Sequence, residues 1–138
     1  MRIEWRPEFS SGVQEVDAMH RLIIDLLTTL DAAGVEDPAG VPGAMRDLDR
    51  TVRAHFEYEE ALLGNLGAQA TASHRREHAH LLRLLGDGVT LCDDRRSSEA
   101  LPTFVRVIGR WLLHEISTND RHLFAYMRAR SGRPVADL

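Results

Sequence analysis

The chain has 138 residues, about the size of one domain, and its 43% hydrophobic and 28% charged residues are typical of a soluble globular protein. A net charge of −4 gives no electrostatic case for a nucleic-acid partner. The apolar runs are too short to cross a bilayer, so no membrane association is expected, and the N-terminus lacks the apolar stretch of a signal peptide. The only cysteine, Cys92, cannot form an internal disulfide, which fits a reducing compartment. We therefore expect a cytoplasmic protein with a single domain over residues 1–138. We expect a monomer, with an oligomer as the alternative.

The N-terminal segment, residues 1–17, shows no sustained helical period. We expect it to form an ordered arm that is packed by Trp5 and Phe9 and runs into the first helix. The first helix is predicted from about residue 16 to residue 33, and Gly34 lies just past it as a C-terminal stop would.

Three further helices are predicted, over about residues 44–66, 71–91 and 99–130. Pro102 falls in the first turn of the last helix, where its missing N–H costs little. The tail, residues 131–138, is expected to fray. No segment alternates with period two, so we expect an all-α protein, an antiparallel up-down-up-down four-helix bundle with an N-terminal arm.

Each predicted helix carries an apolar stripe, in which residues recur at three- and four-residue spacing. The stripes include Leu22, Ile23, Leu26, Leu27 and Leu30; Leu48, Val52, Phe56, Leu62 and Leu63; Leu81, Leu82 and Leu85; and Phe104, Val105, Ile108, Trp111, Leu112 and Ile116.

Histidines and carboxylates lie on these same stripes. His55 and Glu59 are four residues apart, about 40° around a helix, so both face the side that carries Val52. Burying an ionised carboxylate is costly unless a cation or proton compensates its charge. The other helices contribute further side chains of this kind: His20, His74, His78, Glu115 and Asp120.

A metal site would resolve the cost of all these groups, because cations neutralise carboxylates and ligation keeps histidines neutral. Imidazole and carboxylate without thiolate suit iron, manganese or zinc. Up to seven ligands exceed what one ion needs, which favours two ions bridged by carboxylates. By the same helical register, His80, His114 and His122 lie off the stripes and outside the ligand set.

Four motifs in order resemble the hemerythrin family, specifically the single-domain bacterial hemerythrins, over nearly the whole chain. They are WRPEFSSGVQEVDAMH ending at His20, HFEYEE with His55 and Glu59, HRREH with His74 and His78, and WLLHEISTND in the fourth helix.

The resemblance implies a non-haem di-iron centre that binds dioxygen reversibly. One iron would take His20 and His55 and keep an open position for dioxygen. The other would take His74, His78 and a fourth-helix residue. An oxo or hydroxo group and two carboxylates, Glu59 and Asp120, would bridge the two irons.

The fourth helix departs from the family pattern, because Glu115 stands where the family has a histidine. Pairing Glu115 with Asp120 keeps both family spacings, and we favour it. Pairing His114 with Asn119 keeps a histidine but loses the bridging carboxylate. Residues five apart lie about 140° apart on an ideal helix, so Glu115 and Asp120 reach one site only through a distortion such as a π-bulge.

The favoured function is dioxygen binding for carriage, storage or sensing, rather than an enzymatic reaction, with Trp111 lining a dry dioxygen pocket. The alternative is a di-iron redox enzyme that consumes peroxide or nitric oxide, and a weaker one is iron buffering. Because an anionic ligand favours ferric iron, we further hypothesise that Glu115 lowers the reduction potential and speeds autoxidation.

Overall fold

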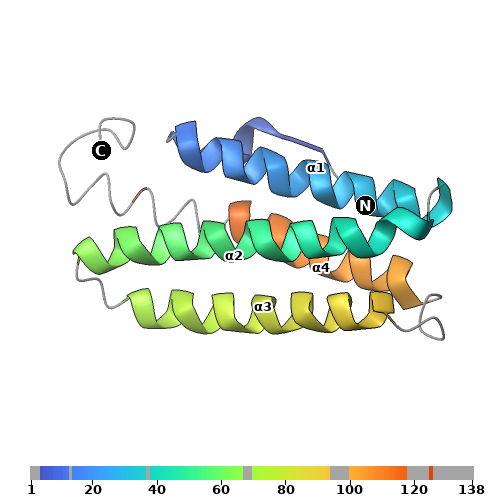
Figure 1. The fold of residues 1–138 in the computed structure, drawn as a ribbon. Helices are drawn as coiled ribbons and strands as arrows, with labels where there is room; N and C mark the ends of the chain where they lie inside the picture. The colour runs from blue at the N-terminus through green and yellow to red at the C-terminus, as the bar shows by residue number, and fades with distance from the viewer. Residues whose placement is uncertain are drawn as a thin grey trace.

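A computed structural model of the chain describes residues 4–12, 14–36, 38–66, 70–93, 100–117 and 125. The described helices, in chain order, are the 3-10 helix η1 (Pro7–Phe9), α1 (Gln14–Glu36), the 3-10 helix η2 (Pro38–Gly40), α2 (Val41–Leu66), α3 (Ala70–Asp93) and α4 (Leu101–Glu115) (Figure 1). None of the described residues forms a strand.

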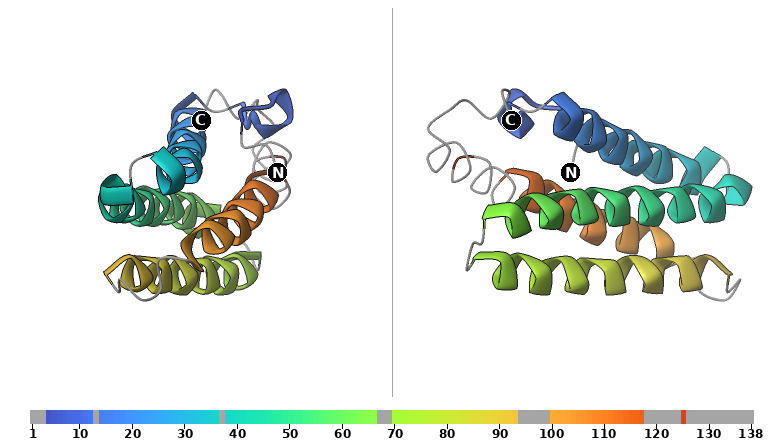
Figure 2. Two further views of the ribbon diagram at one scale, coloured as in Figure 1. Left: turned by 90° about the vertical axis from the view of Figure 1, so that its right-hand side faces the viewer. Right: turned by 60° about the vertical axis from the view of Figure 1, so that its left-hand side comes forward.

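The four long helices form an antiparallel bundle. Helix α2 packs between α1 and α3, and α4 closes the bundle by contacting both α3 and α1. Viewed toward the ends of the helices, the four occupy the corners of the bundle in chain order, with α4 crossing α3 at an angle (Figure 2). The predicted all-α four-helix bundle is confirmed.

One apolar cluster fills the space between the helices, because each helix presents a stripe with a period of three to four residues. Its buried members come from all four long helices and include Ile23, Leu27, Leu30, Met45, Leu48, Val52, Phe56, Leu81, Leu85, Val105, Ile108 and Leu112. The same stripes continue into the polar residues of the candidate site.

The predicted helix ends differ from those observed by a few residues. Helix α2 begins at Val41 instead of residue 44, because Pro42 occupies the first turn, where an N–H has no intrahelical partner. Val41 is itself buried, so the extra turn adds to the core. The predicted fourth helix reached residue 130. The described part is α4 followed by a π-helical turn at residues 116–117, and apart from residue 125 the remainder lies outside the described residues.

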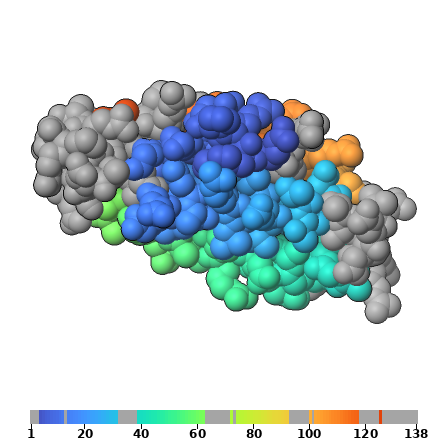
Figure 3. All heavy atoms as spheres, turned by 90° about the horizontal axis from the view of Figure 1, so that it is seen from above, coloured from blue at the N-terminus to red at the C-terminus, as the bar shows by residue number. Residues whose placement is uncertain are grey.

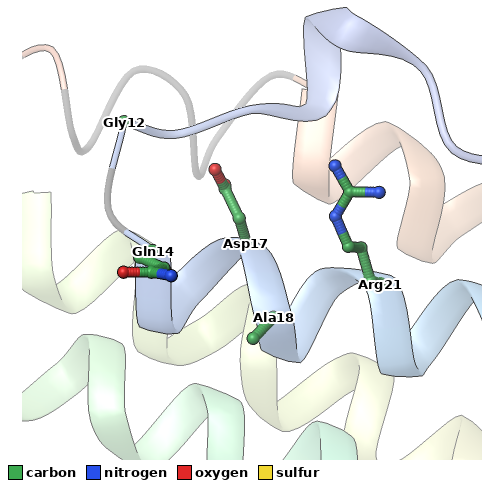
Figure 4. Close-up of a pocket in the computed structure, with 5 residues that line it drawn as sticks. All are labelled: Gly12, Gln14, Asp17, Ala18 and Arg21. Carbon is green, nitrogen blue, oxygen red and sulfur yellow. The ribbon is translucent and has the colours of Figure 1, made fainter.

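The N-terminal arm packs against α1 through its two aromatic residues, and α1 begins at Gln14, inside the segment 1–17 that was predicted as the arm. Phe9 is buried and makes an edge-to-face contact with Trp5, whose ring lies 3.9 Å from the Arg21 guanidinium carbon. The carboxylate of Asp17 accepts hydrogen bonds from the Ser11 amide (2.7 Å), the Ser11 hydroxyl (2.9 Å) and the Ser10 hydroxyl (3.0 Å). Asp17 and Arg21 both point toward the arm (Figure 4), which lies alongside α1 on the face seen in Figure 3.

Two of the described residues in the predicted apolar stripes are exposed. Leu22 is 49% exposed on α1 and Trp111 is 48% exposed on α4, so their assignment to the core was wrong. The buried positions beside them belong to Ile23 and Leu112. Within the part of the chain that the structure describes, no helix combines the length and hydropathy that a membrane span requires.

Candidate metal centre

Six buried polar side chains converge at one level of the bundle. Each is at most 9% exposed, and together they come from all four long helices: His20 from α1, His55 and Glu59 from α2, His74 and His78 from α3, and Glu115 from α4. These are six of the seven predicted ligands. The seventh, Asp120, lies outside the described residues.

The first group joins α1 to α2. The Nε2 atoms of His20 and His55 lie 2.9 Å apart, and the Nε2 atom of His55 lies 2.8 Å from Oε1 of Glu59. All three side chains are at most 1% exposed. Their donor atoms lie within 4.8 Å of one another, close enough to hold one metal ion.

The second group joins α2 to α3 through the same glutamate. The Nε2 atom of His78 lies 3.2 Å from Oε2 of Glu59, and that of His74 lies 3.8 Å from the same oxygen. These donor atoms also fall within 4.8 Å of one another. The four-residue spacing of His74 and His78 places both rings on the buried face of α3.

Glu59 therefore belongs to both groups, and it presents a different carboxylate oxygen to each. Two donors about 2.1 Å from one metal ion and about 90° apart lie about 3 Å from each other. The spacings of 2.8, 2.9 and 3.2 Å lie close to that value, and those of His78 to Glu115 (3.6 Å) and His74 to Glu59 (3.8 Å) are longer. The donor set of imidazoles and carboxylates thus fits a pair of first-row metal ions.

Electrostatics at His78 show how strongly this site attracts positive charge. Burial alone would lower the pKa of the imidazole, but the carboxylates of Glu115 and Glu59 raise its pKa to about 9. A proton on His78 compensates part of the buried negative charge when no cation is present.

The ring of His78 is held in place by a side chain of the neighbouring helix. Phe56 of α2 stacks on it with 3.7 Å between centroids and 2° between the ring planes. This contact fixes the direction in which Nε2 points, toward Glu59 and Glu115.

On α4, the structure brings Glu115 and not His114 to the centre. Glu115 is 4% exposed, with Oε1 3.6 Å from Nε2 of His78, whereas His114 is exposed. A π-helical turn follows at once at Ile116 and Ser117. The five-residue spacing of Glu115 and Asp120 predicted a distortion of this kind, and Asp120 itself lies outside the described residues.

One neighbour of the centre was not anticipated from the sequence. Glu77 of α3 hydrogen-bonds through its side chain to Glu115, and burial and the Glu115 charge together raise the pKa of Glu77. Glu77 lies off the apolar stripe and next to His78, so helical periodicity gave no signal for this contact.

Comparison with known proteins agrees with this geometry. A profile of the hemerythrin HHE cation binding domain matches residues 11–127. A bacteriohemerythrin of Pseudomonas paraeruginosa is 23% identical over 124 residues, covering 84% of this chain and 75% of that protein. A bacteriohemerythrin of Stenotrophomonas maltophilia is 25% identical over 126 residues, covering 85% and 76%. The matched residues include the four helices and all six buried ligand-type side chains, and the chain belongs to the hemerythrin HHE cation binding domain family.

Proposed function

We propose that this protein binds two non-haem iron ions and uses them to bind dioxygen reversibly, for carriage, storage or sensing. The observation that carries the proposal is the position of Glu59, which offers one oxygen to His20 and His55 and the other to His74 and His78. A carboxylate shared in this way is the natural bridge between two cations.

The two sides of the proposed centre are unequal. On the Glu59 Oε1 side, the described ligands are two imidazoles, His20 and His55. On the Oε2 side, two imidazoles are joined by the Glu115 carboxylate. The side with fewer ligands is the one proposed to keep a position open for dioxygen. Iron, when bound, supplies the electrons and the coordination position that dioxygen needs.

The remaining roles belong to the protein. The α4 carboxylate adds negative charge close to His78, and the π-helical turn after it supports a second bridging ligand at Asp120. Phe56, Ile23 and Leu112 surround the ligand-bearing stripes with apolar side chains, which keeps water away from the buried donors.

The test begins with iron-loaded protein that is reduced without air and then exposed to dioxygen. The visible spectrum is recorded over time while iron per chain is measured in parallel. We expect two irons per chain and a new visible band that persists in dioxygen and disappears when dioxygen is removed. A protein that holds no more than one iron, or shows no reversible band, would contradict the proposal.

Glu115 favours one alternative, a redox enzyme that consumes peroxide or nitric oxide. A carboxylate in place of an imidazole stabilises ferric iron and makes the centre resemble carboxylate-rich di-iron enzymes. Immediate irreversible oxidation in the same experiment, followed by multiple turnovers with peroxide or nitric oxide, would support that alternative over dioxygen binding.

A further inference from the structure

A pocket opens on the outer surface of the bundle between α3 and α4, beside the metal centre. It has a volume of about 330 Å³. The side chains that line it and matter here are Arg76, Glu77 and His80 from α3 and Trp111, His114 and Glu115 from α4. Glu115 is the one shared with the buried centre, since its Oε1 atom lies 3.6 Å from Nε2 of His78.

The pocket carries ligand-type side chains from its mouth to its floor. His80 and His114 are exposed, and the His80 ring packs against Trp111 with 5.3 Å between centroids. Glu77 is exposed as well and contacts Glu115, which at 4% exposed forms the floor of the pocket. The lining therefore runs from the imidazoles of His80 and His114 and the carboxyl group of Glu77 to the buried Glu115. Glu115 in turn adjoins the second group of the centre, to which His78 belongs.

We propose that this pocket is the entry port through which ferrous iron reaches the centre, with His80, His114 and Glu77 as transient ligands that pass the ion to Glu115. The inference rests on the iron site proposed above. Two adjoining carboxyl groups offer a divalent cation a set of oxygen donors. Imidazole and carboxylate are also the donors that ferrous iron accepts.

The charges in the pocket distinguish an iron port from a dioxygen port. Dioxygen is neutral and apolar, and these ionisable side chains would give it no advantage. The lining offers a divalent cation oxygen donors from Glu77 and Glu115 and imidazole donors from His80 and His114. Arg76 is the one described lining residue whose permanent positive charge opposes the entry of a cation.

The experiment measures how fast metal-free protein takes up ferrous iron without air. Aliquots are quenched with excess ferrous chelator at increasing times, and protein-bound iron is counted. One variant combines Glu77→Gln, His80→Gln and His114→Gln, and leaves Glu115 and the buried histidines intact. The control is Asp87→Asn, an exposed carboxylate on the same helix, ten residues or about 15 Å from Glu77.

We expect the triple variant to load at least about tenfold more slowly than the parent, because it lacks the three side chains proposed to pass the ion to Glu115, and the negative charge of one of them also attracts the ion. Its final iron content should remain that of the parent, and Asp87→Asn should load at the parental rate. Arg76→Gln should load faster than the parent. General damage to the fold would slow iron loading. Faster loading by Arg76→Gln would therefore show that the pocket is an entry route and that the effect is not structural damage.

The outcomes separate the port from the function. If the triple variant and Arg76→Gln both load at the parental rate to two irons per chain, the port is wrong and the iron site stands. If the parent takes up no iron, both proposals fail. If loading follows the expected pattern but no reversible dioxygen spectrum forms, the port stands and the dioxygen function fails.

Discussion

Phe56 of α2 and His78 of α3 lie face to face, with 3.7 Å between ring centroids and 2° between ring planes. Phe56 directly follows His55 in the chain, so one helical segment supplies a candidate ligand to the first group and orients a ligand of the second.

Replacing this flat ring by a branched side chain tests its orienting role. We expect Phe56→Leu to fold with a loss of about 1 kcal/mol in unfolding free energy, because the volume change is modest. Metal affinity should fall about tenfold, which is the lower end of the range typical for the loss of a contact that orients a metal ligand. Phe104→Leu is the matched control: it is the same change on α4, eleven residues before Glu115. Equal metal affinity in Phe56→Leu and Phe104→Leu would show that stacking on His78 is unimportant.

Removal of metal should destabilise the fold, because Glu59 and Glu115 would remain buried without cations. With metal at about one hundred times its dissociation constant, the loaded protein gains about 2.7 kcal/mol, which raises the melting temperature by about 10 °C. Thermal unfolding followed by circular dichroism, with and without a chelator, measures the difference. Coincident melting curves would mean that no metal contributes to folding.

Glu59→Gln keeps the shape of the shared side chain and removes its charge. Because this carboxylate belongs to both groups, its loss should weaken both metal positions. We therefore expect the iron content to fall below one per chain. Without metal, however, the variant should unfold at a higher temperature than the metal-free parent, since a buried charge has been removed. Glu60→Gln is the control, because Glu60 pairs with Arg75 at the surface. Loss of a single iron would contradict a shared role for Glu59.

Glu115→His tests the charge of the α4 residue. Exchanging an anionic donor for a neutral one should raise the reduction potential of the centre and slow its autoxidation. Glu115→Gln removes the same charge without adding an imidazole, and should shift the potential in the same direction. Redox titration of the loaded proteins provides the measurement. Unchanged potentials in both variants would mean that Glu115 does not interact with the metal.

Two glycines of α3 provide a test of helix packing in which no charge is changed. A methyl group at Gly88 would overlap the ring of Phe104 on α4, whereas one at Gly86 meets nothing within 4 Å. We expect Gly88→Ala to cost about 1–3 kcal/mol, as overpacking does, and Gly86→Ala to be neutral or stabilising by up to about 1 kcal/mol. Chemical denaturation compares them. Equal stabilities would mean that α3 and α4 can separate at little cost.

Much of the site could be predicted because its ligands obey the helical period. His55 with Glu59, and His74 with His78, repeat every four residues on faces that also carry leucine or valine, and all four are buried. The prediction for Trp111 was wrong because it followed the hydrophobicity of the side chain and not its angular position around the helix. Ile108, Leu112 and Glu115 occupy the buried face, and Trp111 lies about 100° from Leu112. Its predicted role in lining a dioxygen pocket stays a prediction.

What periodicity could not supply was the contact between Glu77 and Glu115. Glu77 lies beside His78 on the exposed edge of α3, and only the angle at which α4 crosses α3 brings the two carboxyl groups together. The need for a distortion after Glu115 was predictable from the five-residue spacing. Its location at Ile116 and Ser117 was not, because many neighbouring positions would serve equally well.

The two groups of ligands also become complete at different times as the chain is synthesised. His20, His55 and Glu59 all lie within α1 and α2, so the hairpin of these two helices already contains the whole first group. The second group adds His74 and His78 from α3, and only α4 then brings Glu115 to the Oε2 side of Glu59. Growth from the N-terminus therefore delivers the two halves of the centre in order, with the helix that carries Glu115 arriving last.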